Sequence, residues 1–440
     1  MGGIALLGNG LKSVVTSTVL VSEARFASFL GIAVERVALL METIVAGMVV
    51  ALALYPLFGR RFAVRGIAVA SALIGAAAFA AFAIAATRVG IGGREVWAYV
   101  LLTLGGAALV WLAPSAQSLV LGWPGSDGRK ALTSVWTGAT PAGFLVAPQL
   151  AKWLLPGLGL SAYFASFAVL PLAFAALVAT IAVVTRDPRT DDGLPTRLVV
   201  AFAAAVVAFE AWSTAGSVLG YTAAITLATL PLLAAALAWL AKRARRFAAT
   251  TSTDVGTWCY VAALFALEIP TTGFFEAAFL YDHGLPEALV ADRATLAASA
   301  QVAGTLLAGV VLHRGRGSTP LVAWTSCALV VAGVAGYAAY PSLDSAWYFM
   351  ATAAIVGTGV GALTLVLCLA IVGSAHGAAA LAALPSIAIM IGTELGLELL
   401  QCVFAAAQYA AASPFQFVFA AQAIAALAVL PLLRHALRHG

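Results

Sequence analysis

The chain has 440 residues, of which 63% are hydrophobic and only 9% are charged, and its mean hydropathy is +1.02. A soluble protein cannot bury so large an apolar fraction, so the composition excludes a soluble globular domain and is typical of a polytopic membrane protein. The net charge of +5 does not indicate nucleic-acid binding, because the basic residues lie at the ends of apolar segments, where membrane topology accounts for them.

A helix needs roughly 20 apolar residues to cross the hydrocarbon layer of a bilayer. Charged and Pro/Gly-rich stretches divide this sequence into about fourteen segments of that kind. In chain order they are expected near 3–22, 36–57, 66–87, 97–120, 131–155, 162–184, 198–217, 220–241, 257–280, 293–312, 319–340, 346–371, 380–410 and 414–433. The sequence therefore predicts an all-α polytopic membrane protein with about 14 transmembrane helices.

The basic residues predict the orientation of these helices. With both termini cytoplasmic, the inside loops hold 16 of the 23 Lys and Arg residues, and the outside holds six. Short loops rich in Lys and Arg stay on the cytoplasmic side, so this bias favours that orientation. Merging the segments within 198–241 into one crossing would move the Lys242–Arg246 cluster outside, so fourteen crossings are favoured over thirteen. The six outside residues are Arg25, Arg36, Arg88, Arg94, Lys152 and Arg293.

The second and tenth segments are similar in sequence at an offset of 257 residues. "VERVALLMETIVAGMVVALAL" (34–54) aligns with "ADRATLAASAQVAGTLLAGVV" (291–311), and each copy ends in a short basic loop. Repeated halves with a binding site between them are common in secondary transporters. The predicted division is an N-terminal six-helix bundle (1–190), an inserted helix pair with its linker (191–253) and a C-terminal six-helix bundle (254–440).

With this layout the chain resembles the major facilitator superfamily, most closely its fourteen-helix drug:proton antiporter branch. That family's loop after the second helix reads roughly GxxxDRxGRR; "LALYPLFGRR" keeps Gly59, Arg60 and Arg61 but has Pro56 in the Asp position. The second-half copy, "GVVLHR", keeps Gly309 and Arg314, with His313 in the Asp position. The resemblance implies that Arg60, Arg61, His313 and Arg314 contact helix ends at an inner gate. Alternatively, these loop residues only fix the orientation of the helices in the membrane.

Two further motifs qualify this resemblance. The family's fourth-helix pattern RxxQGxGAA corresponds to "VLLTLGGAA", where Val100 and Thr103 replace the Arg and Gln, and the fifth-helix GPxxGG corresponds only loosely to "GATPAGF" (138–144). The usual fourth-helix proton relay is therefore not expected here. "SEARFASFLG" (22–31) also resembles the ExxERFxYYG signature of proton-dependent oligopeptide transporters, which would imply uptake rather than export.

Ionisable residues inside apolar segments are costly, by about 2.5–3.5 kcal/mol at the bilayer centre, and are expected to face a cavity or a partner. Glu394 and Glu398 are four residues apart, so they share one helix face about 6 Å apart. Gln401 joins the same face. Burial and a neighbouring carboxylate favour protonation, so the two acids could share one proton and titrate as a pair. A role in holding neighbouring helices together is the alternative.

Other buried charges suggest partners for this pair. Glu268 lies two residues before Pro270, which should weaken the helix there. By the repeat, Lys12 falls at the same depth in the first half, so Lys12 could pair with Glu268 or with Glu394, or within its own half. Glu276 could be the outer end of a proton relay or a rim residue.

Glu42 could meet the Glu398 end of the acidic face. The other intramembrane acid and the glycines have mainly structural interpretations. Glu210 lies in the inserted pair and is interpreted as structural or as a lateral lipid contact. The spacing in "GTGVG" (357–361) predicts close packing of two helices.

These observations predict a proton-coupled secondary transporter that exports a small organic molecule across the bacterial inner membrane as a monomer. Proton-driven uptake of a nutrient or peptide is the alternative; a membrane enzyme, with "RDPRTDDGLPTR" (186–197) as its only acidic loop, and a scramblase are less favoured. Neither cofactor nor metal is expected, since the histidines and the four scattered cysteines have no ligand spacing. The chain also has no ATP-binding GxxxxGK[ST] motif.

Overall fold

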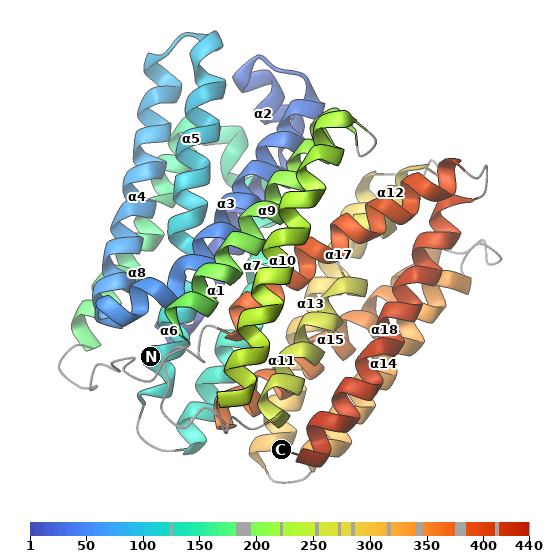
Figure 1. Cartoon of the computed structure of the whole chain (residues 1–440). Helices are drawn as coiled ribbons and strands as arrows, with labels where there is room; N and C mark the ends of the chain where they lie inside the picture. Colours follow the sequence, from blue (N-terminus) through green and yellow to red (C-terminus); the bar gives the residue numbers. More distant parts are fainter. Residues whose placement is uncertain are drawn as a thin grey trace. The chain divides into compact units, whose positions relative to one another are not determined.

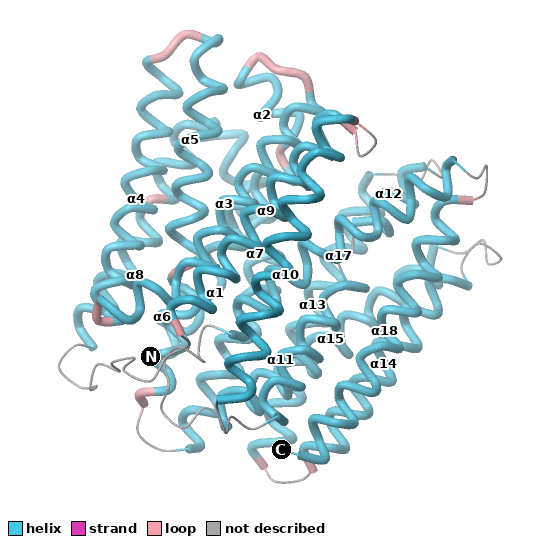
Figure 2. Tube along the Cα trace, viewed as in Figure 1, coloured by secondary structure: helices cyan, strands magenta, loops and turns pink. Residues whose placement is uncertain are grey.

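Helices form every regular element in the described part of this computed structural model (Figure 2). The described residues are 1–123, 126–181, 195–220, 223–250, 255–271, 274–282, 287–314, 318–339, 346–374, 384–409 and 413–439. Most of the acidic loop 186–197 and the start of the predicted segment 380–410 lie outside them. The chain divides into two compact units, and helix α7 contributes residues to both.

The first unit contains the helices that precede residue 254, apart from the N-terminal half of α7 (Figure 1). Helix α9 packs against α3 and α10 packs against α9, so the predicted inserted pair is attached to this unit. The helices are α1 (Gly2–Val21), α2 (Glu23–Leu30), α3 (Val34–Arg61), α4 (Val64–Arg88), α5 (Ile91–Val110), α6 (Leu112–Leu121), α7 (Ser126–Phe167), α8 (Val169–Ile181), α9 (Thr196–Leu219) and α10 (Ala224–Thr250).

The second unit contains the N-terminal half of α7 and the later helices. Within it α15 packs against α13 and α14, and α18 packs against α11, α14 and α17. Its elements are α11 (Val255–Glu268), the 3₁₀ turn η1 (Ile269–Thr271), α12 (Phe274–Asp282), α13 (Glu287–His313), α14 (Thr319–Ala339), α15 (Ala346–Ser374), α17 (Leu384–Tyr409) and α18 (Pro414–His439).

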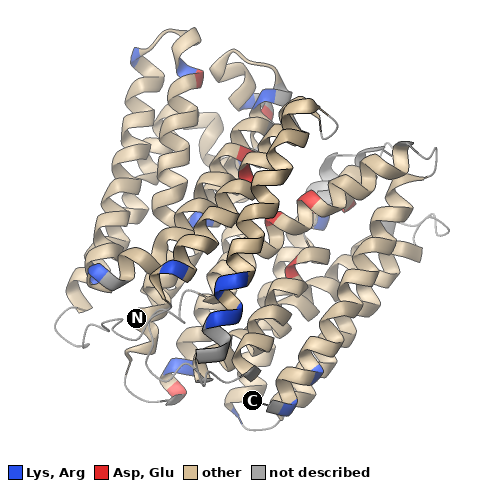
Figure 3. Ribbon diagram, viewed as in Figure 1, with Lys and Arg blue, Asp and Glu red and all other residues tan. Residues whose placement is uncertain are grey.

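Eleven helical segments among the described residues are long and apolar enough to cross a membrane. These eleven omit α1 and the α11–α12 pair, and they treat Asp127–Ile181 as one span. Gly159 interrupts that span with φ 71° and ψ 168°, a left-handed φ that glycine adopts without steric cost. Figure 3 shows the positions of the charged residues, several of them at helix ends and a few inside the apolar helices.

The weakening of the helix predicted at Pro270 is confirmed, and in the structure it amounts to a break. Helix α11 ends at Glu268, a 3₁₀ turn follows, and α12 restarts at Phe274. Proline lacks an N–H donor and its ring displaces the preceding turn, so the helix cannot continue through it undistorted. Pro56 behaves differently, since it lies buried within α3, which continues to Arg61.

The close helix contact predicted from "GTGVG" is also confirmed. A Cβ added to Gly357 would meet the backbone oxygen of Ala297, and one added to Gly361 would meet that of Gln301. Both oxygens belong to α13, so the glycines of α15 let two helix backbones touch. Such small-residue contacts replace hydrophobic burial as the packing force between membrane helices.

The helices continue the sequence repeat beyond the segment in which it was recognised. Moving α4 by 257 residues gives 321–345, against Thr319–Ala339 for α14. Moving α5 in the same way gives 348–367, inside the α15 range Ala346–Ser374. The offset therefore relates three consecutive helices of the two halves, α3–α5 and α13–α15.

Candidate functional site

The second unit holds a buried ion pair between α12 and α13. The Arg293 guanidinium lies 3.7 Å from the Glu276 carboxylate, and their side chains are 7% and 3% exposed. Gln422 on α18 donates from Nε2 to Glu276 Oε1 at 3.4 Å. The carboxylate therefore has both a counter-charge and a neutral donor, which a buried charge needs to offset its desolvation.

Aromatic side chains surround the other end of this pair. Arg293 donates from Nη2 to the Tyr337 hydroxyl at 3.4 Å. Its guanidinium carbon lies 5.8 Å from the Tyr337 ring centre and 5.9 Å from that of Phe349, within the range of cation–π attraction. Five helices, α12, α13, α14, α15 and α18, thus meet at one guanidinium and one carboxylate.

The structure adds to the sequence interpretation of these two residues. Arg293 was assigned to the outer side of the membrane, and that assignment stays a prediction; the structure shows that only 5% of the residue is exposed. Glu276 is 2% exposed, so it is not a rim residue. Sequence reasoning did not assign Gln422 or Tyr337 to a site. The repeat aligned Arg293 with Arg36, and this alignment gave no indication of a buried partner.

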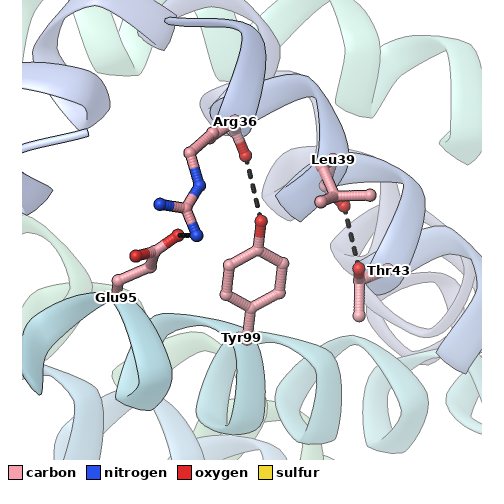
Figure 4. Close-up of polar contacts among 5 residues, drawn as sticks. All are labelled: Arg36, Leu39, Thr43, Glu95 and Tyr99. Atoms are coloured by element: carbon pink, nitrogen blue, oxygen red, sulfur yellow. Dashed lines mark hydrogen bonds and ion pairs between the residues drawn. The ribbon is translucent and has the colours of Figure 1, made fainter. Parts of the chain in front are cut away.

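Arg36 shows how differently the first unit uses the aligned position (Figure 4). Its Nη2 lies 2.7 Å from Glu95 Oε1 on α5, and its side chain is 57% exposed. Tyr99 donates its hydroxyl to the Arg36 carbonyl at 3.1 Å, which also links α5 to α3. The two arginines thus occupy aligned positions, but Arg36 is exposed and pairs with a partly buried glutamate, whereas Arg293 and its glutamate are both buried.

The acidic pair that attracted attention in the sequence lies on α17. Glu394 and Glu398 are 7% and 2% exposed, and Gln401 is partly exposed. The helical structure of 384–409 places the two acids one turn apart on one face, as the spacing predicted.

The opposite face of α17 packs against the α11 break. A Cβ added to Gly392 would lie 2.6 Å from the Phe265 oxygen, and one added to Gly396 would lie 2.6 Å from the Ile269 Cα. Each glutamate follows its glycine by two positions, a rotation of about 200° around the helix. The glycines therefore fix the rotation of α17 and turn Glu394 and Glu398 away from α11.

Glu268 lies on the glycine side of α17. Thr393 donates its hydroxyl to Glu268 Oε2 at 3.5 Å, a long hydrogen bond. Glu268 is half-buried, at the last position of α11. Within this unit the structure brings Glu268 to Thr393, and it leaves the Glu394/Glu398 face on the other side of the helix.

The remaining predicted residues are distributed over both units. Lys12 is 3% exposed in α1, and Glu42 is half-buried in α3, so both belong to the first unit. Pairs between these residues and Glu268, Glu394 or Glu398 stay predictions.

The predicted gate residues lie at helix ends rather than inside loops. Arg60 and Arg61 are the last two residues of α3, His313 is the last of α13, and Arg314 follows it. The Arg61, His313 and Arg314 side chains are exposed. Among the described residues, no group of three or more His, Cys, Asp or Glu side chains could hold a metal ion.

A shallow groove lies along the C-terminal part of α9. Its volume is about 500 Å³, and its lining is apolar except for Glu210, which is 6% exposed, and Thr214. Glu210 belongs to a buried stripe with Ala203, Val206 and Ser213, on the side of α9 that packs within the unit. Its burial agrees with the structural interpretation drawn from the sequence.

The fold of the whole chain is similar to those of solved major facilitator superfamily transporters. The proton:xylose symporter XylE bound to 6-bromo-6-deoxy-D-glucose matches with a TM-score of 0.64 and 15% identity over 96% of this chain and 93% of that chain. A double-tryptophan XylE mutant matches with a TM-score of 0.67 and 14% identity over 98% and 94%. The E. coli fucose:proton symporter FucP matches with a TM-score of 0.63 and 13% identity over 98% of both chains.

No protein-family model matches the sequence, and no curated protein matches it significantly. The structural likeness, at these identities, establishes the fold. This chain is a multi-pass membrane protein with the major facilitator fold. The expected resemblance to that superfamily is confirmed at the level of fold, and its antiporter branch stays a prediction.

Proposed function

We propose that this protein is a proton-coupled secondary active transporter that moves a small organic molecule across the membrane by alternating access. The observation that supports this most is the presence of buried acidic side chains in the apolar helices of a fold shared with two proton symporters. A buried carboxylate is costly in a membrane, and reversible protonation relieves that cost. A transporter can use this protonation to couple its conformations to a proton gradient.

Glu394 and Glu398 are the proposed proton site. They are buried one helical turn apart, so two negative charges there repel each other and one shared proton relieves the repulsion. Glu276 forms a buried ion pair with Arg293 at 3.7 Å and is interpreted as part of the packing of the second unit. Glu268, Gln401, Lys12 and Glu42 are proposed as secondary members of the coupling or substrate network.

The proposed topology has fourteen crossings and cytoplasmic termini. Counting α1, the broken α11–α12 pair and the two segments around Gly159 separately extends the eleven apolar spans to fourteen. Residues 1–190 and 254–440 would form the two bundles, with 191–253 as the inserted pair. The protein would act as a monomer in the bacterial inner membrane and would not be an enzyme.

Export is the direction that the antiporter resemblance implies. Uptake is a second candidate, because the two structural neighbours are described as proton symporters for xylose and fucose. The two directions differ in the sign of the proton movement that accompanies the substrate. A symporter carries protons with the substrate, whereas an antiporter carries them against it.

The test uses purified full-length protein in liposomes that contain a pH-sensitive dye. Addition of xylose or fucose outside should acidify the lumen if the protein is a symporter. Addition of an aromatic cation to liposomes with an acidic lumen should raise the lumen pH if it is an antiporter. Accumulation of a substrate that continues after the pH gradient is collapsed would contradict proton coupling.

A further inference from the structure

Helix α10 is the most exposed apolar helix of the described chain. Only 6% of its membrane-span window is buried inside the protein, against 22% or more for the other ten spans. Its contact stripe runs through Thr226, Thr229, Leu233, Ala236, Leu240 and Arg243, which are buried or half-buried at helical spacing. The stripe packs against α9, so the rest of the helix surface faces outward.

An outward ridge runs along α10 at intervals of seven residues. It consists of Ile225, Leu232, Trp239 and Arg246, and seven residues correspond to about two helical turns. The first three are 63%, 67% and 37% exposed, and Arg246 is also exposed. Lys242 lies three residues after Trp239 and is exposed on the same side. The ridge therefore changes along its length from aliphatic to aromatic to basic.

This order matches the order of groups in a phospholipid. The span Ala224–Arg246 ends at the basic residues, and its 23 residues correspond to about 35 Å of helix, a little more than the hydrocarbon thickness. Tryptophan side chains favour the membrane–water interface, and clustered Lys and Arg beside a membrane helix attract anionic head groups. Four of the five residues from Lys242 to Arg246 are basic.

We propose that the C-terminal end of α10 binds an anionic phospholipid. Lys242 and Arg246 contact its phosphate, Trp239 lies at the level of its glycerol backbone, and one acyl chain follows Leu232 and Ile225. The inserted pair would then anchor its unit to anionic lipid. This inference concerns α10 alone and is independent of the proposed transport activity.

The test is native mass spectrometry of the full-length protein in detergent, titrated with dioleoyl phosphatidylglycerol or dioleoyl phosphatidylcholine. The Lys242→Gln/Arg246→Gln double variant should bind phosphatidylglycerol about tenfold more weakly, since two charge-assisted contacts to the phosphate are lost. Its binding of phosphatidylcholine should change less than twofold, because that head group carries its own cation. Trp239→Leu should weaken phosphatidylglycerol binding about threefold.

Helix α18 provides a matched control. Arg434 and Arg438 are exposed and one turn apart, but no aromatic residue lies in the two turns before them. Arg434→Gln/Arg438→Gln removes the same charge and should change phosphatidylglycerol binding less than twofold. Equal losses in the two double variants, or no loss in either, would overturn the proposal.

Two further measurements cover the case in which the α10 double variant fails to insert. Raising the salt from 0.1 to 0.5 M should weaken phosphatidylglycerol binding by wild-type protein, because the contacts are electrostatic. The charge-keeping variant Lys242→Arg/Arg246→Lys should bind within twofold of wild type. Binding that is insensitive to salt would reject a charge-based head-group site.

Discussion

The Arg293 guanidinium lies 3.7 Å from the Glu276 carboxylate, and both side chains are almost fully buried in the second unit. In the other half of the repeat, Arg36 lies 2.7 Å from Glu95 with its side chain 57% exposed. The Arg36–Glu95 pair is closer, but its arginine is more than half exposed, so water screens the Arg36 charge, although Glu95 is only 16% exposed. Water neither screens the charges of the buried pair nor replaces a lost partner, so its two members depend on each other more strongly.

Loss of one member of the buried pair should destabilise the protein strongly. Arg293→Met leaves the Glu276 carboxylate without its buried counter-charge, and such single removals cost about 3–5 kcal/mol. The double variant Glu276→Gln/Arg293→Met removes both charges and should recover much of that loss. The midpoint of thermal unfolding in detergent, followed by tryptophan fluorescence, measures the change.

Arg36→Gln is the matched control for the aligned arginine of the first half. Because Arg36 is more than half exposed and Glu95 keeps some access to water, the loss should be smaller, about 1 kcal/mol. A single Arg293 variant as stable as the Arg36 variant would show that the buried pair contributes little to stability.

The glycines of α15 should differ sharply in their tolerance of a methyl group. Gly361→Ala places a Cβ against the Gln301 backbone oxygen, which cannot move without shifting α13. Overpacking of this kind costs about 1–3 kcal/mol. Gly373→Ala in the same helix meets no atom within 4 Å and should leave stability unchanged or slightly increase it. Equal unfolding midpoints for the two variants would contradict the close α13–α15 contact.

Substitution of the two acids of α17 should distinguish a role in proton coupling from a role in folding. Glu394→Gln and Glu398→Gln keep the shape and hydrogen-bonding capacity of the side chain but cannot exchange a proton near neutral pH. Each should insert and unfold like wild type while losing at least about tenfold in transport driven by a pH gradient, measured in the liposome assay. Downhill exchange of substrate should persist. Poor expression of both variants would favour the structural alternative for this face.

Topology can be tested with single cysteines in a cysteine-free background. Ala63 and Ser318 are exposed residues that follow α3 and α13, beside the basic residues of the predicted inside loops, and Ser28 is an exposed residue of α2. Positive-inside orientation predicts that a membrane-impermeant maleimide added to intact cells labels Ser28→Cys but neither Ala63→Cys nor Ser318→Cys. Labelling of Ala63→Cys from outside would reverse the proposed orientation.

The sequence predicted much of this architecture because its strongest signals are local. Hydropathy alone located the apolar segments, and each of them coincides with a helix or a pair of adjacent helices in the structure. Pro270 predicted a local weakening of the helix because the missing donor is a property of the residue itself. The 357–361 glycines predicted a close contact, since a residue without a side chain lets two backbones approach.

Other features could not be predicted from local patterns. The rotation of each helix about its own axis could not be predicted. Membrane helices are apolar on the lipid side as well as on the packed side, so the periodicity of apolar residues does not show which side is packed. Only the tertiary structure decides that Gly392 and Gly396 face α11 and turn Glu394 and Glu398 away from Glu268. Only it pairs Arg293 with Glu276 across two helices, because a charge near a segment end can point outward to water or inward to a partner. The sequence by itself determined where this protein is helical, apolar and charged, whereas packing decided which of those charges meet.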